Sequence, residues 1–238
     1  MRITWAIFRR EFASYFNSPL ALIAVPVFLA LVGLFSLIFN DIFDAGLVTL
    51  RTVFFWSAMF LVLLVPALTM RLFAEERRTG SLELVATLPL TETQLVLGKY
   101  LAACAVIGLA LALTLSYPLT LDLYGDLDWG PALGGYLGLA LLGFAYAAIG
   151  TAASSLTSNQ IVAFLVGAFV CLVPYVTGLF LHQVPAGILP LVQYLSFDYH
   201  FSGLSRGVLD TRNLIFYATV AAGSLQVAIF ALEQRRLS

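Results

Sequence analysis

Six long runs of apolar residues, none interrupted by an acidic, basic or histidine side chain, constrain this chain more than any other feature. Each run is about as long as the ~20 residues that a helix needs to cross ~30 Å of hydrocarbon. The runs are Leu20–Phe39, Thr52–Met70, Tyr100–Leu119, Ala132–Ala153, Ile161–Leu181 and Leu214–Leu232. They predict an all-α integral membrane protein with six transmembrane helices. The prolines that can kink these helices are Pro26, Pro66, Pro118 and Pro174.

The composition excludes most other classes of protein. Apolar residues make up 61% of the 238 residues and charged residues 11%, where soluble domains usually carry about 25% charged residues. The net charge is -1 and the mean hydropathy is +0.97, so neither a soluble enzyme nor a nucleic-acid-binding protein fits. The longest segment between runs, 182–213, is shorter than the ~40 residues that a domain usually needs to fold unaided. We therefore expect a single membrane domain over residues 1–238.

The basic residues predict how the chain crosses the membrane. Nine of the twelve Lys and Arg residues lie in the segments that are inside if the N-terminus is cytoplasmic: 1–19, 71–99, 154–160 and 233–238. The outer segments hold the other three, Arg51, Arg206 and Arg212. Because basic residues accumulate in cytoplasmic loops, we expect both termini to lie in the cytoplasm.

The chain lacks the residues that catalysis or ion coupling would need. Without an ionisable residue inside the runs, a proton or ion pathway is disfavoured, and an ion-coupled secondary transporter remains a minor alternative. Lys99, the only lysine, follows Gly98, but the surrounding residues do not form a phosphate-binding loop. Cys104 and Cys171 lie within apolar runs and are expected to be buried hydrophobic residues. We expect no catalytic residue, metal or cofactor in this chain.

Residues 2–18 are expected to form an amphipathic helix. The aromatic residues Trp5, Phe8, Phe12 and Tyr15 recur at helical spacing and would share one face. Such a helix can lie in the membrane interface before the first span. The alternative is a basic N-terminal segment that only holds the start of the chain on the cytoplasmic side, as basic residues generally do.

The segment 73–90, after the second run, carries the most informative pattern. Gly80 can end one helix, and Ser81 can begin another with Glu83 near its N-terminus. Leu84 and Leu88 would form one apolar face, and Pro89 would end this second helix after about two turns. The residues alone are compatible with a short helix that docks on another protein or with a charged cytoplasmic loop.

This segment resembles the signature of the permease subunits of type 2 ABC transporters. In that family a charged run ends in Gly-Thr-x-Glu and, after apolar residues, closes with Pro and a hydrophobic residue. Here Gly80-Ser81-Leu82-Glu83 and Pro89-Leu90 match, with Ser in place of Thr. The string Tyr199-His200-Phe201, followed by Ser205 to Arg212, resembles the gliding-motility (Gld-type) branch, which is near the permeases of nitrous-oxide-reductase maturation.

The resemblance implies a permease subunit in a bacterial inner membrane that translocates an unidentified substrate. ABC ATPase subunits would bind ATP and Mg²⁺, and a second copy or a homologous permease would complete the path. Apolar, aromatic walls favour a lipid-like or amphipathic substrate. A periplasmic accessory protein is a further expected partner. The alternative is an ATPase-linked scaffold that anchors periplasmic machinery without solute transport. The residues expected to contact the ATPase through the coupling helix are Glu75, Glu76, Gly80, Ser81, Glu83, Leu84, Leu88 and Pro89.

The outer segment 182–213 is apolar for a loop and is interrupted by Pro185 and Pro190. The resemblance implies short re-entrant helices here, and the aromatic residues expected to close the outer gate are Tyr194, Phe197, Tyr199 and Phe201. A metal site formed by His182, Asp198 and His200 is a weaker reading than a hydrogen-bonded histidine at an interface. In the fourth run, Gly134, Gly138, Ala145 and Ala148 predict close helix packing.

Overall fold

The computed structural model describes residues 2–38, 50–81, 90–123, 125 and 127–236. Within these ranges every regular element is a helix. The long helices are α2 (Pro19–Ile38), α4 (Arg51–Thr69), α7 (Glu92–Leu113), α9 (Trp129–Leu156), α10 (Gln160–Leu179) and α13 (Thr211–Arg236). The short ones are α1 (Arg2–Asn17), α5 (Arg71–Arg78), α8 (Ser116–Asp122), η1 (Leu181–Gln183), α11 (Leu189–Leu195) and α12 (Phe197–Ser205).

Six helical stretches are long and apolar enough to cross a membrane, and each contains one of the six predicted runs in whole or in large part. The third run differs from the expected continuous helix, because α7 ends at Leu113 and α8 begins at Ser116. Pro118 has no N–H to donate to the carbonyl of Thr114, four residues earlier. That carbonyl instead accepts hydrogen bonds from the Tyr117 N–H at 3.0 Å and the Tyr136 hydroxyl at 2.8 Å. Pro26, Pro66 and Pro174, by contrast, lie inside uninterrupted helices.

Helix α9 lies at the centre of the bundle and contacts α4, α5, α7, α10, α12 and α13. Its small residues explain this position, since they let neighbouring helices approach closely. A Cβ atom at Gly134 would lie 2.5 Å from the carbonyl oxygen of Leu204 on α12, and one at Gly138 would lie 3.1 Å from Phe201. The close packing predicted for this run is confirmed.

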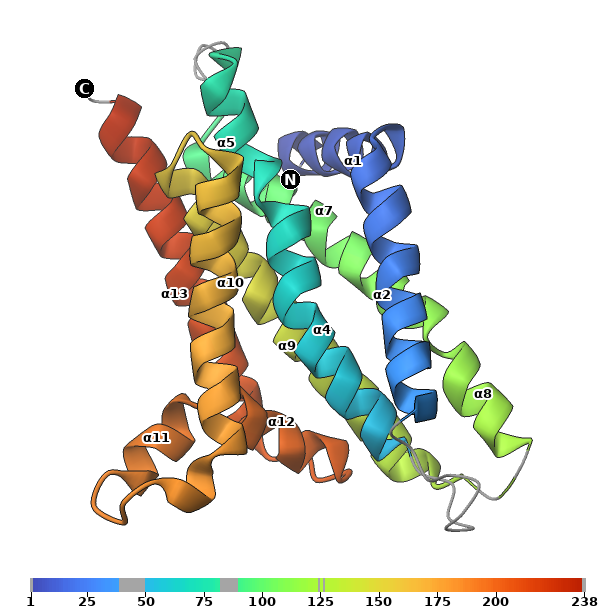
Figure 1. Cartoon of the computed structure of the whole chain (residues 1–238). Coiled ribbons are helices and arrows are strands. Elements are labelled where there is room, and N and C mark those ends of the chain that lie inside the picture. The colour runs from blue at the N-terminus through green and yellow to red at the C-terminus, as the bar shows by residue number, and fades with distance from the viewer. Residues whose placement is uncertain (1, 39–49, 82–89, 124, 126, 237–238) are drawn as a thin grey trace.

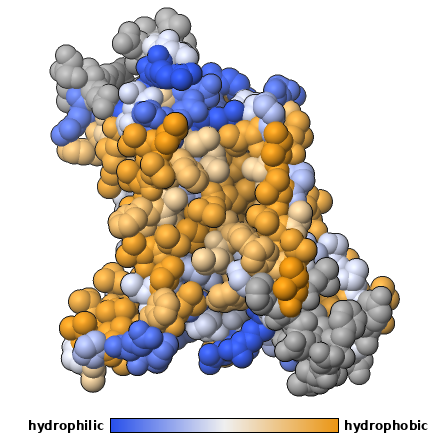
Figure 2. All heavy atoms as spheres, in the orientation of Figure 1, coloured by the Kyte–Doolittle hydropathy of each residue, from blue (hydrophilic) through white to orange (hydrophobic). Residues whose placement is uncertain are grey.

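Figure 1 shows two distinct ends of the bundle. Helix α1 lies crosswise to the spans at the same end as α5 and the C-terminus, and α11 and α12 lie at the other end. We call these the α1/α5 end and the α11/α12 end. Figure 2 shows an apolar band around the middle of the visible face, with hydrophilic residues gathered at both ends. A protein with this surface fits a bilayer whose hydrocarbon surrounds the band.

Candidate functional site

The only lysine of the chain, Lys99, is 1% exposed and lies in the first turns of α7. A buried ammonium group needs compensating partners, because removing a charge from water is costly. The Lys99 Nζ atom lies 2.9 Å from Glu76 Oε1 and 3.1 Å from Glu11 Oε1. It also lies 5.3 Å from the centre of the Phe73 ring, within range of a cation–π interaction.

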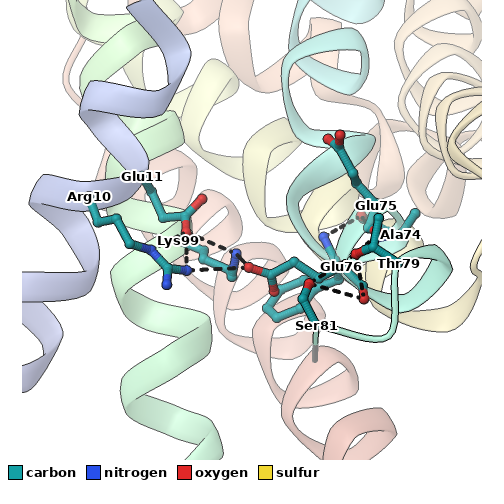
Figure 3. A network of polar contacts seen from close by, with 10 residues as sticks. Arg10, Glu11, Ala74, Glu75, Glu76, Thr79, Ser81 and Lys99 are labelled. Atoms are coloured by element: carbon teal, nitrogen blue, oxygen red, sulfur yellow. Dashed lines mark hydrogen bonds and ion pairs between the residues drawn. The ribbon is translucent and has the colours of Figure 1, made fainter. Parts of the chain in front are cut away.

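A second cation completes this group. The Arg10 guanidinium lies 2.7 Å from Glu11 Oε1 and 3.3 Å from Glu76 Oε1, so each carboxylate contacts both cations. Figure 3 shows Arg10 and Glu11 reaching from α1, Glu76 from α5 and Lys99 from α7. We call Arg10, Glu11, Glu76 and Lys99 the ion cluster. Its two positive and two negative charges balance and connect three helices that are distant in sequence.

Glu11 is held in its ionised form. Burial alone would raise its pKa, but the neighbouring charges of Lys99 and Arg10 outweigh this effect, and the pKa lies below its ordinary value. Removing one partner would leave a buried charge uncompensated, which typically costs about 3–5 kcal/mol. The ion cluster therefore fixes the relative positions of α1, α5 and α7.

The packing of α1 against α7 places Glu11 in the ion cluster. Ile7, Glu11 and Tyr15, four residues apart, form the buried face of α1. Gly98 leaves room for this approach, because a Cβ atom there would lie 2.7 Å from Ile7 Cγ2. Tyr15 donates a hydrogen bond to the carbonyl of Leu68 at 3.0 Å.

The prediction of which aromatic residues share one face of α1 is therefore partly wrong. The aromatic contacts run through Trp5, Phe8, Phe12 and Phe16, with centroids 4.8 to 5.8 Å apart; the first two pairs are stacked and the third is edge-on. Tyr15 was expected on this face but points into the protein. The spacing of three or four residues allows both assignments, and the contact with α4 selects the inward one for Tyr15.

Ser154 of α9 fixes the junction between α4 and α5. Its hydroxyl accepts hydrogen bonds from the N–H groups of Phe73 at 3.0 Å and Ala74 at 3.1 Å, and donates to the carbonyl of Met70 at 2.8 Å. One side chain thus satisfies three backbone groups where the helix changes direction. The start of α5 is thereby attached to the central helix.

Four of the predicted ATPase-contact residues lie in the described part of the chain. Glu75 is exposed and points away from the ion cluster, whereas Glu76 belongs to it (Figure 3). Gly80 has a φ of 71°, a conformation that favours glycine, and follows the last turn of α5, so its predicted role in ending a helix is confirmed. The Ser81 hydroxyl lies 3.0 Å from that of Thr79.

The other four, Glu83, Leu84, Leu88 and Pro89, lie outside the described residues, as does the short helix expected there. The chain re-enters the described part before α7, whose N-terminus is well defined. The Thr91 hydroxyl accepts from the N–H of Gln94 at 3.3 Å, and the Gln94 side chain accepts from the N–H of Thr91 at 3.4 Å. This capping box fixes the point where segment 82–89 joins α7.

Sequence reasoning missed Arg10, Glu11, Lys99 and Ser154 as members of this site. Lys99 and Arg10 were counted only as basic residues that orient the chain. A usable signal was present, because a lone lysine beside Gly98 at the start of an apolar run needs a carboxylate partner. The spacing of Ile7, Glu11 and Tyr15 could have indicated which face of α1 supplies it.

At the opposite end, the four predicted gate residues differ in burial. Phe197 and Phe201 on α12 are 3% and 4% exposed and pack into the core, with the Phe197 ring 5.2 Å from that of Tyr146. Tyr194 and Tyr199 are 63% and 45% exposed. The short helices expected in segment 182–213 are present as α11 and α12.

His200 joins these two helices to α13. One ring nitrogen, Nδ1, lies 2.8 Å from Asn213 Oδ1, and Nε2 donates to the carbonyl of Tyr194 at 3.1 Å. The ring also stacks on Phe216, with centroids 4.0 Å apart. The reading of His200 as a hydrogen-bonded interface residue is confirmed. His182 is exposed and near Gln183 instead, and within the described residues no three His, Cys, Asp or Glu side chains form a metal-binding group.

Comparison with known proteins adds an independent finding. A family model described as ABC-2 family transporter protein matches residues 47–231, from just before α4 to near the end of α13. No curated protein sequence matches the chain significantly. The matched range contains Glu76 and Lys99 but not α1. The ion cluster therefore connects the matched region to a helix outside it.

Proposed function

This chain belongs to the ABC-2 transporter family, and on that premise we propose that it translocates a substrate across a bacterial inner membrane using ATP hydrolysed by separate subunits. The family match and the six apolar helices support a membrane permease subunit of an ABC transporter. Membership of this family implies association with ABC ATPase subunits and dimerisation. ATP and Mg²⁺ would bind to the ATPase subunits, and the permease supplies the path.

In this proposal the α1/α5 end faces the cytoplasm. The excess of basic residues in the segments at this end supports that orientation. Helix α1 would lie in the inner membrane interface, because it runs crosswise to the spans and carries a row of stacked aromatic rings (Figure 1). Helices α11 and α12 would then lie on the periplasmic side as the outer gate.

We assign the ATPase contact to segment 73–90 and the transmission of its movement to the ion cluster. Segment 82–89 is attached to α5 on one side and to the capped start of α7 on the other. Both helices contribute to the ion cluster, through Glu76 and Lys99, and Glu11 extends it to α1. A displacement of this segment by the ATPase would therefore move α1, α5 and α7 together. The double ion pair of buried Lys99 is the observation that carries this proposal.

Fewer observations support the branch of the family and the class of substrate. Assignment to the gliding-motility branch rests on the resemblance of residues 199–212 alone. An amphipathic substrate is favoured because the six spans carry no charged residue within their predicted apolar runs. Contact with a periplasmic accessory protein rests on the same resemblance.

The proposal is tested by co-expressing the full chain with a candidate ABC ATPase subunit and co-purifying the two. Glu83→Arg reverses a charge within the contact, and Gly80→Pro is incompatible with the φ of 71° at that residue. Both variants should lose the ATPase, while Asp122→Arg, the same reversal at an exposed residue after the third span, should retain it. Retention of the ATPase by both Gly80→Pro and Glu83→Arg would overturn the assignment.

A further inference from the structure

A large hollow lies at the α11/α12 end, between the ends of α4, α10 and α13 and the two short helices. Its volume is about 1000 Å³, at the upper end of the ~300–1,000 Å³ typical of small-molecule sites. We call it the outer chamber. Its position where three spans end places it at the depth of lipid headgroups, if the spans cross the bilayer as proposed.

Three arginines line the outer chamber: Arg51, Arg206 and Arg212. They come from the start of α4, the end of α12 and the start of α13, and they are the three basic residues of the outer segments. In the part of the chain that the structure describes, no carboxylate forms an ion pair with Arg206 or Arg212. Their guanidinium groups are exposed and available to a ligand.

Among the described residues, two carboxylates line the outer chamber, and they compensate this charge only in part. One oxygen of Asp210 accepts a hydrogen bond from the backbone N–H of Arg212 at 2.9 Å, which caps the start of α13. Asp198 is partly buried, and burial raises its pKa, which favours the neutral form. Within the described residues, neither carboxylate therefore fully compensates the charges of Arg206 and Arg212.

The rest of the lining is apolar and exposed. Tyr194, Tyr199, Val208 and Ile215 all line the outer chamber and leave much of their surface uncovered. The exposed apolar side chains beside the guanidinium groups of Arg206 and Arg212 match a ligand that has both an acidic and an apolar part. A small polar anion would leave this apolar surface in water, and a neutral lipid would leave the guanidinium groups without partners.

We propose that the outer chamber binds the phosphate-bearing headgroup of an anionic amphiphile, with the apolar part of the ligand against the exposed side chains of α11, α12 and α13. Arginine suits this role because its planar guanidinium can donate two parallel hydrogen bonds to one phosphate. As a site for the transported substrate, this inference rests on the proposed function; as a binding site, it stands on the lining of the outer chamber.

The test is a titration of the full-length chain in detergent with phosphatidylglycerol, followed by native mass spectrometry. Phosphatidylcholine, whose headgroup has no net charge, serves as the comparison lipid, and inorganic phosphate is tested as a free ligand and as a competitor. Arg206→Gln and Arg212→Gln each remove one guanidinium from the outer chamber. Arg9→Gln removes an exposed one from α1, at the other end, and Arg206→Lys keeps the charge without the paired donors.

We expect saturable binding of phosphatidylglycerol, weaker binding of phosphatidylcholine, and about a tenfold loss of affinity in Arg206→Gln and Arg212→Gln. Arg9→Gln should bind like the unmodified chain, and Arg206→Lys should fall between. Equal binding of the two lipids, or an equal loss in Arg9→Gln, would overturn the proposal. Arginine-dependent binding of inorganic phosphate without binding of phosphatidylglycerol would also overturn it. No ATPase is present, so this outcome and that of the co-purification experiment are independent.

Discussion

At the α1/α5 end three helices meet through buried charges, whereas at the α11/α12 end the contacts are aromatic rings and one hydrogen-bonded histidine. Lys99 is bonded to two carboxylates from different helices. His200 bonds to one side chain and one carbonyl and stacks on Phe216. The hollow beside the ion cluster at the first end is about 470 Å³, and the one at the second end is about 1000 Å³.

This difference corresponds to two tasks in a transporter. Ion pairs out of water lose much energy when their geometry changes, so they keep helices in register while a displacement passes through them. An aromatic pair adds only about 0.5–1.5 kcal/mol beyond the area that it buries, so these contacts can rearrange at lower cost, and the hollow beside them leaves room for a ligand. Under the proposed function, the first end would transmit movement and the second would contact the substrate.

Among these predictions, breaking the ion cluster should have the largest effect on the stability of the chain. Lys99→Met removes the buried cation between Glu11 and Glu76 but leaves Arg10 in contact with both carboxylates. We therefore expect a loss of about 3 kcal/mol in the free energy of unfolding, the lower end of the range for a buried ion pair that loses one partner. The measurement is reversible unfolding in detergent, with Arg9→Gln on the exposed side of α1 as the control. The triple variant Glu11→Gln, Glu76→Gln, Lys99→Met should be more stable than Lys99→Met. If it were less stable, packing and not charge would hold this end together.

Loss of the His200 contacts should destabilise the chain less than loss of Lys99, and the effect should be confined to the α11/α12 end. His200→Ala removes two hydrogen bonds and a stacked ring, which we expect to destabilise the chain by about 2–3 kcal/mol. Limited proteolysis should show faster cleavage in segment 182–213, and His182→Ala, at an exposed position, should not. Faster cleavage near Gly80 in His200→Ala would mean that the stability of the α1/α5 end depends on contacts at the α11/α12 end.

The hydrogen bonds of Ser154 sharpen the comparison within α9. Ser154→Ala leaves the N–H groups of Phe73 and Ala74 without their acceptor, at an expected cost of about 1–2 kcal/mol. The adjacent Ser155 is also buried, but its hydroxyl bonds only to the Ala152 carbonyl of its own helix, at 2.8 Å. Ser155→Ala should therefore cost less in the same unfolding measurement. Equal costs would show that Ser154 does not position α5.

The smallest expected effect is that the melting temperature depends on pH through Glu11. The pKa of Glu11 lies below its ordinary value of 4.5, so its ion pairs add stability above that pH, and the contribution is lost as the pH falls through the lower folded value. The melting temperature of the unmodified chain should therefore fall more steeply on acidification below pH 4.5 than that of Glu11→Gln. Identical slopes would contradict the ionised state of Glu11.

The sequence predicted the spans well because their signal is local. A run without charged residues can be identified without knowing its neighbours, and Gly80 ends a helix through its own backbone conformation. The ion cluster could not be assembled in this way, because Glu76 and Lys99 are 23 residues apart and Arg10 and Glu76 are 66 apart. The sequence around each charged residue does not indicate which residue it pairs with. Tyr15 was misplaced for the same reason, since the helices that cover one face of α1 come from elsewhere in the chain.

The most direct test of the central claim is whether α1 and α5 move as one unit when ATP binds. Spin labels at Arg9→Cys and Arg78→Cys, both exposed, report the distance between these helices in the complex with the ATPase, after the buried Cys104 and Cys171 are replaced by alanine. We predict the same distance distribution without nucleotide and with bound ATP, and a broader one after Lys99→Met. A distance that changes on ATP binding while Lys99 is intact would contradict the account.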